Sequence, residues 1–212
     1  MMDFLDAWTD TRTMAELLIV VDEDDPKLPE YRRMLRDTAS WVHWLVYNGT
    51  MGQGMVPGLN WGVSLPIAQR HDVVGFMGDD HRPRTLGWDA LLEAPAKNRI
   101  AYGDDLLQRQ SLPTAVAMPR RFVEALGFMA PPVLHHLYVD NYWASLGGQV
   151  GLEYVPQVVI EHMHPVAGKA DWDDEYKRVN DGALYQADAN AFHKYVGEGR
   201  LEEDVQKILA VK

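Results

Sequence analysis

The chain has 212 residues, of which 47% are hydrophobic and 24% are charged, a composition typical of a globular protein with a core of its own. Its 31 acidic and 20 basic residues give a net charge of -11, which argues against a general affinity for nucleic-acid phosphates. The absence of cysteine excludes disulfide and thiolate chemistry, and no apolar run approaches the ~20 residues that span a membrane. The acidic N-terminal stretch MMDFLDAWTD is unlike a secretory signal, so we expect a cytoplasmic protein.

Helical and strand-like segments alternate along the first two thirds of the chain. In chain order, the pattern predicts a helix at 2–9, a strand at 16–21, a helix at 29–36, a strand at 41–47, a glycine-rich loop at 48–58, a helix at 59–69, a strand at 72–77, a helix at 88–94, strands at 100–102 and 114–118, helices at 120–126 and 139–146, and a strand at 151–160 broken at Pro156. This alternation predicts an α/β three-layer sandwich with a mostly parallel central sheet. Ligands of such sheets bind at the carboxyl ends of the strands.

The segment VGFMGDDHRP (73–82) places two aspartates and a histidine where an apolar strand ends at a glycine. Mg²⁺ and Mn²⁺ prefer carboxylate oxygens and Mn²⁺ also accepts imidazole, so Asp79, Asp80 and His81 are candidates for a metal site. The alternative is a solvated acidic turn in which an aspartate caps the next helix. Gly78 favours the site, because a glycine lets the backbone turn sharply or approach a ligand closely.

The segment IEHMHP (160–165) follows the last strong strand. His162 and His164 alternate, so in an extended chain they face opposite ways and only one of them points to a shared site. A lone histidine is more often a surface or core residue than a ligand. A pair of histidines at a strand end, in a chain that also carries the two aspartates above, makes metal ligation an equal alternative.

The segment YVDNYWASLG (138–147) holds Asp140 among aromatic residues at a predicted helix start. One interpretation is a helix N-cap. The other is a general base, because partial burial beside aromatic rings raises a carboxylate pKa toward the working pH. The rings of Tyr138, Tyr142 and Trp143 could also stack on the apolar face of a sugar.

Fewer signals point to a nucleotide. Asp22 ends a strand in DEDDP (22–26), where its carboxylate could accept hydrogen bonds from a base or a ribose hydroxyl; the alternative is a polar turn. Arg82, Arg84 and Lys169 could neutralise phosphate charge, although most such residues are simply solvated. The segment GLNWG (58–62) lacks the spacing of a P-loop or a Rossmann fingerprint, and the chain has no GxSxG serine-hydrolase motif.

Taken in order, these segments resemble those of the GT-A class of nucleotide-sugar glycosyltransferases, and most closely its small family-2-like members from bacteria and phages. The likeness covers about residues 3–180 and rests on the ordered set LLIVVDEDDP, GLNWG, VVGFMGDDHRP, GWD, YVDNYW and VIEHMHP rather than on any single motif. It implies one domain over 1–212, with a nucleotide-binding part at 1–100, an acceptor and catalytic part at 101–180, and a helical tail at 181–212.

The resemblance also implies a role for each candidate residue. The donor would be a nucleoside-diphosphate sugar, the cofactor Mn²⁺ or Mg²⁺, and the acceptor a hydroxyl group. The implied roles are Asp22, Asn60, Asp79 and Arg84 at the donor nucleotide; Asp80, His162 and His164 at the metal, with His81 beside them; Asp140 as the base that deprotonates the acceptor; and Tyr138, Tyr142 and Trp143 at the acceptor or transferred sugar.

Two features depart from the family's pattern. The family's metal-binding motif has acidic residues at both ends, whereas here His81 occupies the third position of the motif that starts at Asp79. Such enzymes also begin with a strand and a Thr/Ser-Arg-Pro-type turn at the nucleotide base, but MMDFLDAW resembles the helix that follows that strand. We therefore expect either that another segment or subunit fills this edge of the sheet, or that activity is weak.

The sequence thus predicts a metal-dependent, inverting glycosyltransferase. Three alternatives remain: a truncated domain kept as a binding or assembly module, a nucleotidyltransferase, and a metal-dependent hydrolase built on Asp and His. A nucleotidyltransferase would need a basic glycine-rich phosphate loop near the N-terminus, which this chain lacks. The amphipathic tail GEGRLEEDVQKIL is expected either to cover the sheet or to join two copies of the chain in a homodimer.

Overall fold

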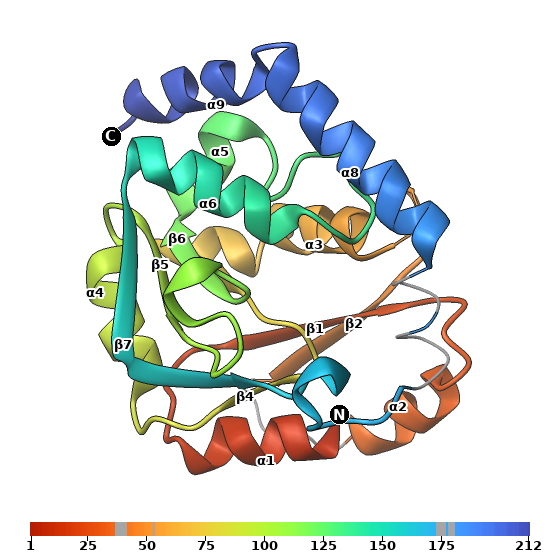
Figure 1. Cartoon of the computed structure of the whole chain (residues 1–212). Helices are drawn as coiled ribbons and strands as arrows, with labels where there is room; N and C mark the ends of the chain where they lie inside the picture. The colour runs from red at the N-terminus through yellow and green to blue at the C-terminus, as the bar shows by residue number, and fades with distance from the viewer. Residues whose placement is uncertain (37–41, 53, 173–176, 178–180) are drawn as a thin grey trace.

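The computed structural model describes residues 1–36, 42–52, 54–172, 177 and 181–212. Two β-sheets lie between helices (Figure 1). The smaller sheet pairs two parallel strands, β1 (Leu17–Asp22) and β2 (Val42–Tyr47). The larger has the order β3 (Val73–Phe76), β6 (Val116–Pro119), β5 (Ile100–Asp104), β7 (Leu152–His162), β4 (His81–Pro83).

The α/β class is confirmed, but the larger sheet is mixed rather than mostly parallel. Only β5 and β7 run parallel, whereas β3–β6, β5–β6 and β4–β7 are antiparallel pairs. Parallel neighbours need a long crossover, usually a helix. Residues 105–115 between β5 and β6 contain only the short 3₁₀ turn η2 (Arg109–Ser111), so β6 returns antiparallel to β5.

The helices lie close to their predicted places. Their bounds are α1 (Met2–Asp10), α2 (Leu28–Met34), α3 (Met55–Ser64), α4 (Trp88–Ala96), α5 (Arg120–Leu126), α6 (Val139–Val150), α8 (Gly182–Gly197) and α9 (Arg200–Leu209), with 3₁₀ turns η1 (Ala68–Arg70) and η3 (Pro165–Ala167). The largest difference is α3, which begins inside the predicted loop at 48–58. It ends before Pro66, because the residue that precedes a proline avoids helical geometry. None of the described helices is long and apolar enough to cross a membrane.

The two sheets share the same helical layers. On one face, Trp8 of α1 packs edge-on against Trp88 of α4, with ring centroids 5.1 Å apart, beside Val73 of β3. On the other face, α3 packs on β1, where a Cβ added to Gly62 would lie 3.3 Å from Val20. The larger core lies on this second face and gathers α6, α8 and α9 over the sheet (Figure 1).

Strand β7 is longer than predicted. The expected break at Pro156 is wrong, because β7 runs unbroken from Leu152 to His162. Its partner register on β5 jumps from Val155 to Val159, so Pro156 lies in an irregularity where it need not donate a ladder hydrogen bond. The continued strand carries His162 to the sheet edge formed by β4.

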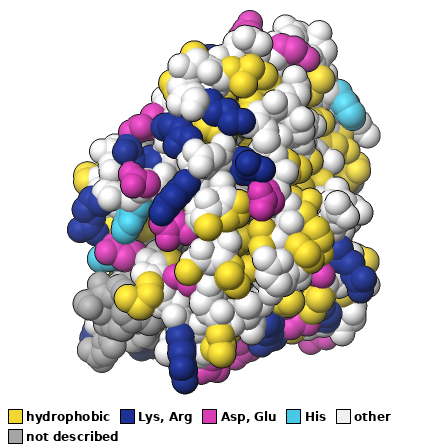
Figure 2. Space-filling view, turned by 90° about the vertical axis from the view of Figure 1, so that its left-hand side faces the viewer, with side chains coloured by type: hydrophobic (Ala, Val, Ile, Leu, Met, Phe, Trp, Pro, Cys, Tyr) yellow, Lys and Arg dark blue, Asp and Glu magenta, His cyan; other side chains and the backbone are white. Residues whose placement is uncertain are grey.

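The predicted helical tail packs onto the rest of the chain. Leu201, Val205 and Ile208 of α9 are buried in the larger core, where α9 contacts α5 and α6. On the face in Figure 2, Lys and Arg side chains are interspersed with Asp and Glu rather than gathered alone.

Candidate metal centre

The pairing of β4 with β7 brings two distant histidines together. The sequence did not predict β4, a three-residue strand that starts at His81. In the antiparallel register His81 lies directly opposite His162, and the backbone N–H of Met163 donates to the carbonyl of Asp80 at 2.8 Å. Directly opposed residues have neighbouring side chains, so this short strand determines which histidines meet.

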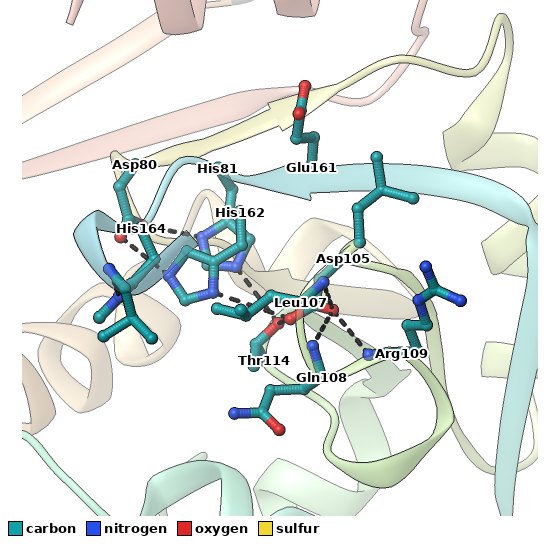
Figure 3. Close-up of polar contacts among 12 residues, drawn as sticks. Asp80, His81, Asp105, Leu107, Gln108, Arg109, Thr114, Glu161, His162 and His164 are labelled. Carbon is teal, nitrogen blue, oxygen red and sulfur yellow. Dashed lines mark hydrogen bonds and ion pairs between the residues drawn. The ribbon is translucent and has the colours of Figure 1, made fainter. Parts of the chain in front are cut away.

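Asp80 joins the two imidazoles. Its Oδ1 lies 3.0 Å from His81 Nδ1, and its Oδ2 lies 2.9 Å from His162 Nε2. The two rings stack with centroids 4.2 Å apart (Figure 3). One ligand atom from each of the three residues lies within 4.8 Å of the others, an arrangement that could hold a metal ion. We refer to these three residues as the Asp80–His81–His162 group.

The contacts within the group shift the pKa values of Asp80 and His162 strongly in opposite directions. Burial raises the pKa of Asp80, but contacts with His162 and His81 outweigh it and hold this pKa far below its ordinary value. Burial lowers the pKa of His162, but the carboxylates of Asp105 and Asp80 outweigh it and raise the pKa of His162 to about 9. Without a metal, His162 is therefore an imidazolium at neutral pH, and a cation that binds must displace its proton.

Asp105 lies behind His162 and is itself held rigidly. Its Oδ2 is 3.7 Å from His162 Nδ1, too long for a hydrogen bond, and accepts one from Thr114 Oγ1 at 2.9 Å. Its Oδ1 accepts hydrogen bonds at 2.7–2.9 Å from the backbone N–H groups of Leu107, Gln108 and Arg109 (Figure 3). Asp105 thus places a fixed negative charge behind His162, at ion-pair distance and without a hydrogen bond to the ring.

Gly78 is required by the packing of this group. A Cβ at this position would lie 2.7 Å from Asp80 Oδ1 and 3.1 Å from His81 Nδ1. Any larger residue would therefore push two of the three candidate ligands. The sequence correctly singled out this glycine, although for its backbone freedom rather than for the space that it leaves to the side chains.

The donor set fits some divalent cations better than others. Mg²⁺ prefers oxygen ligands, whereas two imidazoles and one carboxylate suit Mn²⁺, Fe²⁺ and Zn²⁺. The expectation of Mn²⁺ or Mg²⁺ is thus supported only as far as a candidate cation site.

In the described part of the chain, His164 lies outside the group. Its Nδ1 accepts a hydrogen bond from the Val166 backbone at the start of η3.

The group opens into a cleft of about 1580 Å³, whose wall includes several of the predicted site residues. These are Asp22, Asp79, Asp80, Arg84, Tyr138, Asp140, Trp143, His162 and His164.

Asp140 lies in the first turn of α6 and is not the N-cap, which is Tyr138. Burial raises the pKa of the Asp140 carboxyl, the direction that a general base requires. Loss of hydration in the cleft, together with the Asp80 charge, raises the pKa of Asp79 as well.

Two predicted ligand-binding residues have structural contacts instead. Asn60 is buried, and both polar atoms of its side chain bond to the backbone of Met129 and Ala130, which argues against a role at a nucleotide. Tyr142 is fully buried and its hydroxyl donates to Asp204 at 3.0 Å, which argues against contact with a sugar.

Three other residues predicted to contact a ligand form bonds with protein groups but also reach the cleft wall. Trp143 is also buried and its indole N–H donates to the carbonyl of Met129 at 2.9 Å, although part of it reaches the cleft wall. Arg84 forms an ion pair with Glu161 at 2.8 Å. The hydroxyl of Tyr138 donates to that of Tyr185 at 3.0 Å.

The sequence did not lead to Asp105, and it indicated His81 only as a neighbour of the metal ligands rather than as one of them. Asp105 ends the motif YGDD (102–105), which repeats the Gly-Asp-Asp pattern of residues 78–80 at the end of another strand. That repetition was the available signal. His81 could not be preferred over His164 without knowing that β4 exists.

No protein-family model matches this chain, and a search of curated proteins finds no match either. The case for a function therefore rests on the geometry of the cleft.

Proposed function

We propose that this protein is a divalent-cation-dependent glycosyltransferase, which moves a sugar from a nucleoside-diphosphate sugar to an acceptor hydroxyl group. The observation that carries the proposal is that the Asp80–His81–His162 group opens into the same cleft as Asp140 and Asp22. A cation site, a candidate base and a strand-end carboxylate for a ribose or base thus lie around one space.

The charge of the protein favours a cation. A nucleoside diphosphate is an anion, and its leaving group gains charge as the glycosidic bond breaks. The chain has a net charge of -11, and Asp22, Asp79 and Asp140 line the cleft. These three carboxylates would oppose an anionic donor, and a cation beside them would offset their charge. A bound Mn²⁺ would supply Lewis-acid stabilisation of the diphosphate.

The protein's own residues take separate parts in this proposal. The Asp80–His81–His162 group holds the cation, and Asp105 supplies a fixed negative charge behind His162. Asp140, with its raised pKa, accepts the proton of the acceptor hydroxyl, which makes the transfer inverting.

The test is calorimetric titration of the protein with Mn²⁺, followed by UDP-, GDP- and TDP-sugars, with turnover measured as release of the nucleoside diphosphate. We expect donor binding only with Mn²⁺ present. Asp80→Ala should abolish this binding, whereas Asp140→Asn should preserve binding and lower turnover by about 10² to 10⁴-fold.

Three results would contradict the proposal. Failure of every donor to bind in the presence of Mn²⁺ would remove the substrate class. Equal loss of donor binding in Asp80→Ala and Asp140→Asn would remove the division of roles. Phosphoester hydrolysis without any sugar acceptor would indicate the Asp/His hydrolase instead.

A second candidate is a catalytically weak binding or assembly module. It is favoured by one observation, the separation of β1 and β2 from the larger sheet. Donor hydrolysis or transfer at a measurable rate by the chain alone would exclude it.

A further inference from the structure

Two strand edges face each other across the cleft. Strand β1 is bonded to β2 on one side, and β3 is bonded to β6 on one side. Among the described residues, no strand pairs with the other edge of either one, yet Leu17–Val21 and Val73–Met77 both line the cleft. We call the space between these two segments the strand slot.

The two edges run in the same direction. At their N-terminal ends, Glu16 Oε2 lies 2.9 Å from Arg70 Nη2 and 3.5 Å from His71 Nε2, so side chains rather than backbones bridge the slot. At their C-terminal ends, the charges of Asp25 and Asp79 both act on Tyr31. The slot therefore separates two strands with parallel orientation, as a missing central strand would.

The hydrogen-bond pattern shows which backbone groups face the slot. The N–H of Arg120 bonds to the carbonyl of Asp72, so by the antiparallel alternation Val74 and Phe76 bond to β6. Val73 and Gly75 then direct their N–H and C=O groups into the slot, and Gly75 is exposed although it lies in mid-strand.

The same reasoning applies to β1. The N–H of Glu23 bonds to the carbonyl of Tyr47, so in this parallel pair Ile19 and Val21 bond to β2. The backbone groups of Leu18 and Val20 consequently face the slot. Each edge thus presents a regular set of donors and acceptors at alternate residues.

Helices cover both faces of the slot. Phe4, Trp8 and Trp88 line one side of the cleft, and Gly58 and Leu59 of α3 line the other. A strand that is buried on both faces consists of a nearly continuous apolar run rather than an alternating one. At the carboxyl end of the slot, Asp22, Asp25 and Asp79 lie on the cleft wall, with the basic Lys27 and Arg82 beside them.

We propose that the strand slot binds an extended segment of a separate protein chain, which adds a strand between β1 and β3 and joins the two sheets. The segment is an apolar run of about six residues, the length of β1, without proline or charge, and it lies parallel to both edges. One or two Lys or Arg residues follow the run, because its carboxyl end meets the three carboxylates at that end of the slot.

The test uses a fluorescent synthetic peptide with six Val, Ile and Leu residues followed by two lysines. The matched control is the same peptide with its third and fourth residues N-methylated, which removes backbone donors and keeps the apolar surface. We expect at least about tenfold weaker binding of the methylated peptide, since strand addition depends on main-chain hydrogen bonds.

Amide hydrogen exchange followed by NMR gives the residue-level readout. Binding should protect the amides of Leu18, Val20, Val73 and Gly75, and should change those of their bonded neighbours Ile19 and Val74 much less. Equal binding of both peptides, or protection without this alternation, would overturn the proposal. Self-association of the chain that protects the same four amides would overturn it in favour of a second copy as the occupant.

This inference does not depend on the glycosyltransferase proposal. Asp80→Ala removes a candidate metal ligand but leaves the strand slot intact, so peptide binding should be unchanged in that variant. Loss of donor binding together with retained peptide binding would leave this proposal standing alone.

Discussion

Two carboxylates with lowered pKa values, in two regions of the molecule, are satisfied in different ways. Under the helical tail, Asp188 is fully buried and accepts backbone N–H bonds from His135, His136 and Leu137 at 2.8–3.0 Å, and the exposed His135 ring adds one contact, at 3.1 Å from its Nδ1. At the cleft wall, the partly buried Asp80 is bonded to two imidazoles, one on each carboxylate oxygen. A backbone N–H keeps its proton and cannot bind a metal, whereas an imidazole nitrogen can lose its proton and become a ligand.

Asp204, like Asp188, is a carboxylate with structural hydrogen-bond partners. It accepts hydrogen bonds from the hydroxyls of Tyr142 and Tyr195, at 3.0 and 2.6 Å, inside the larger core. The type of partner, and whether a space lies beside it, separates a structural carboxylate from a candidate ligand. A lowered pKa alone does not make this distinction, because Asp188 and Asp80 share it.

The largest expected effect tests the structural side of the comparison. Asp188→Ala removes a fully buried carboxylate and leaves the backbone N–H groups of His135, His136 and Leu137 without this acceptor, so we expect a loss of about 3 kcal/mol in the free energy of unfolding, measured with urea. The matched control is Asp181→Ala, which removes the exposed N-cap of α8 and should cost about 1 kcal/mol. Mn²⁺ affinity that falls in Asp188→Ala while the protein remains folded would break the comparison.

The next effect tests the cleft side. Gly78→Ala should lower Mn²⁺ affinity at least about tenfold, because the added Cβ overlaps Asp80 Oδ1. The control is Gly148→Ala in α6, where the added Cβ meets no described atom within 4 Å and should slightly stabilise the helix. Unchanged affinity in Gly78→Ala, measured by titration calorimetry, would show that Asp80 and His81 are not the ligands.

Lowering the pH should reduce the stability that the Asp188 carboxylate contributes. Burial raises the pKa of Asp188, but backbone hydrogen bonds outweigh it and hold the pKa below its ordinary value. The stability that Asp188 contributes is therefore present above the unfolded-state pKa of about 3.9 and is lost as pH falls through the folded-state pKa. In urea unfolding at pH 7, 5 and 3, the difference between wild type and Asp188→Asn should be constant at the two higher values and shrink at pH 3; a difference that instead grows on acidification would contradict this.

The smallest expected effect concerns His164. Its Nδ1 accepts the Val166 N–H and caps η3, and it lies outside the Asp80–His81–His162 group. His164→Ala should therefore change Mn²⁺ affinity by less than about threefold and cost roughly 1 kcal/mol of stability. A tenfold loss of affinity would restore His164 to the ligand set.

The sequence predicted most helices and the strand-end location of Asp80, because both depend on local patterns of apolar residues, glycine and proline. It could not predict β4, since three residues carry too little periodicity. The choice of His81 over His164 therefore depended on long-range pairing. The structural roles of Asn60 and Tyr142 also escaped prediction, because their partners lie far away in the sequence.

The sheet direction was misjudged for a related reason. The alternation of helices and strands predicted parallel pairing, but the segment between β5 and β6 lacks a helix long enough for a crossover. The expectation that another chain or segment fills a sheet edge is now a specific proposal about the edges of β1 and β3.

Mn²⁺ titration of the metal-free wild type, His81→Ala and His164→Ala, followed by calorimetry and electron paramagnetic resonance, tests the central claim most directly. The account predicts one Mn²⁺ per chain in the wild type and in His164→Ala, and at least a tenfold loss of affinity in His81→Ala. Wild-type affinity in His81→Ala, or no specific Mn²⁺ binding by the wild type, would contradict it.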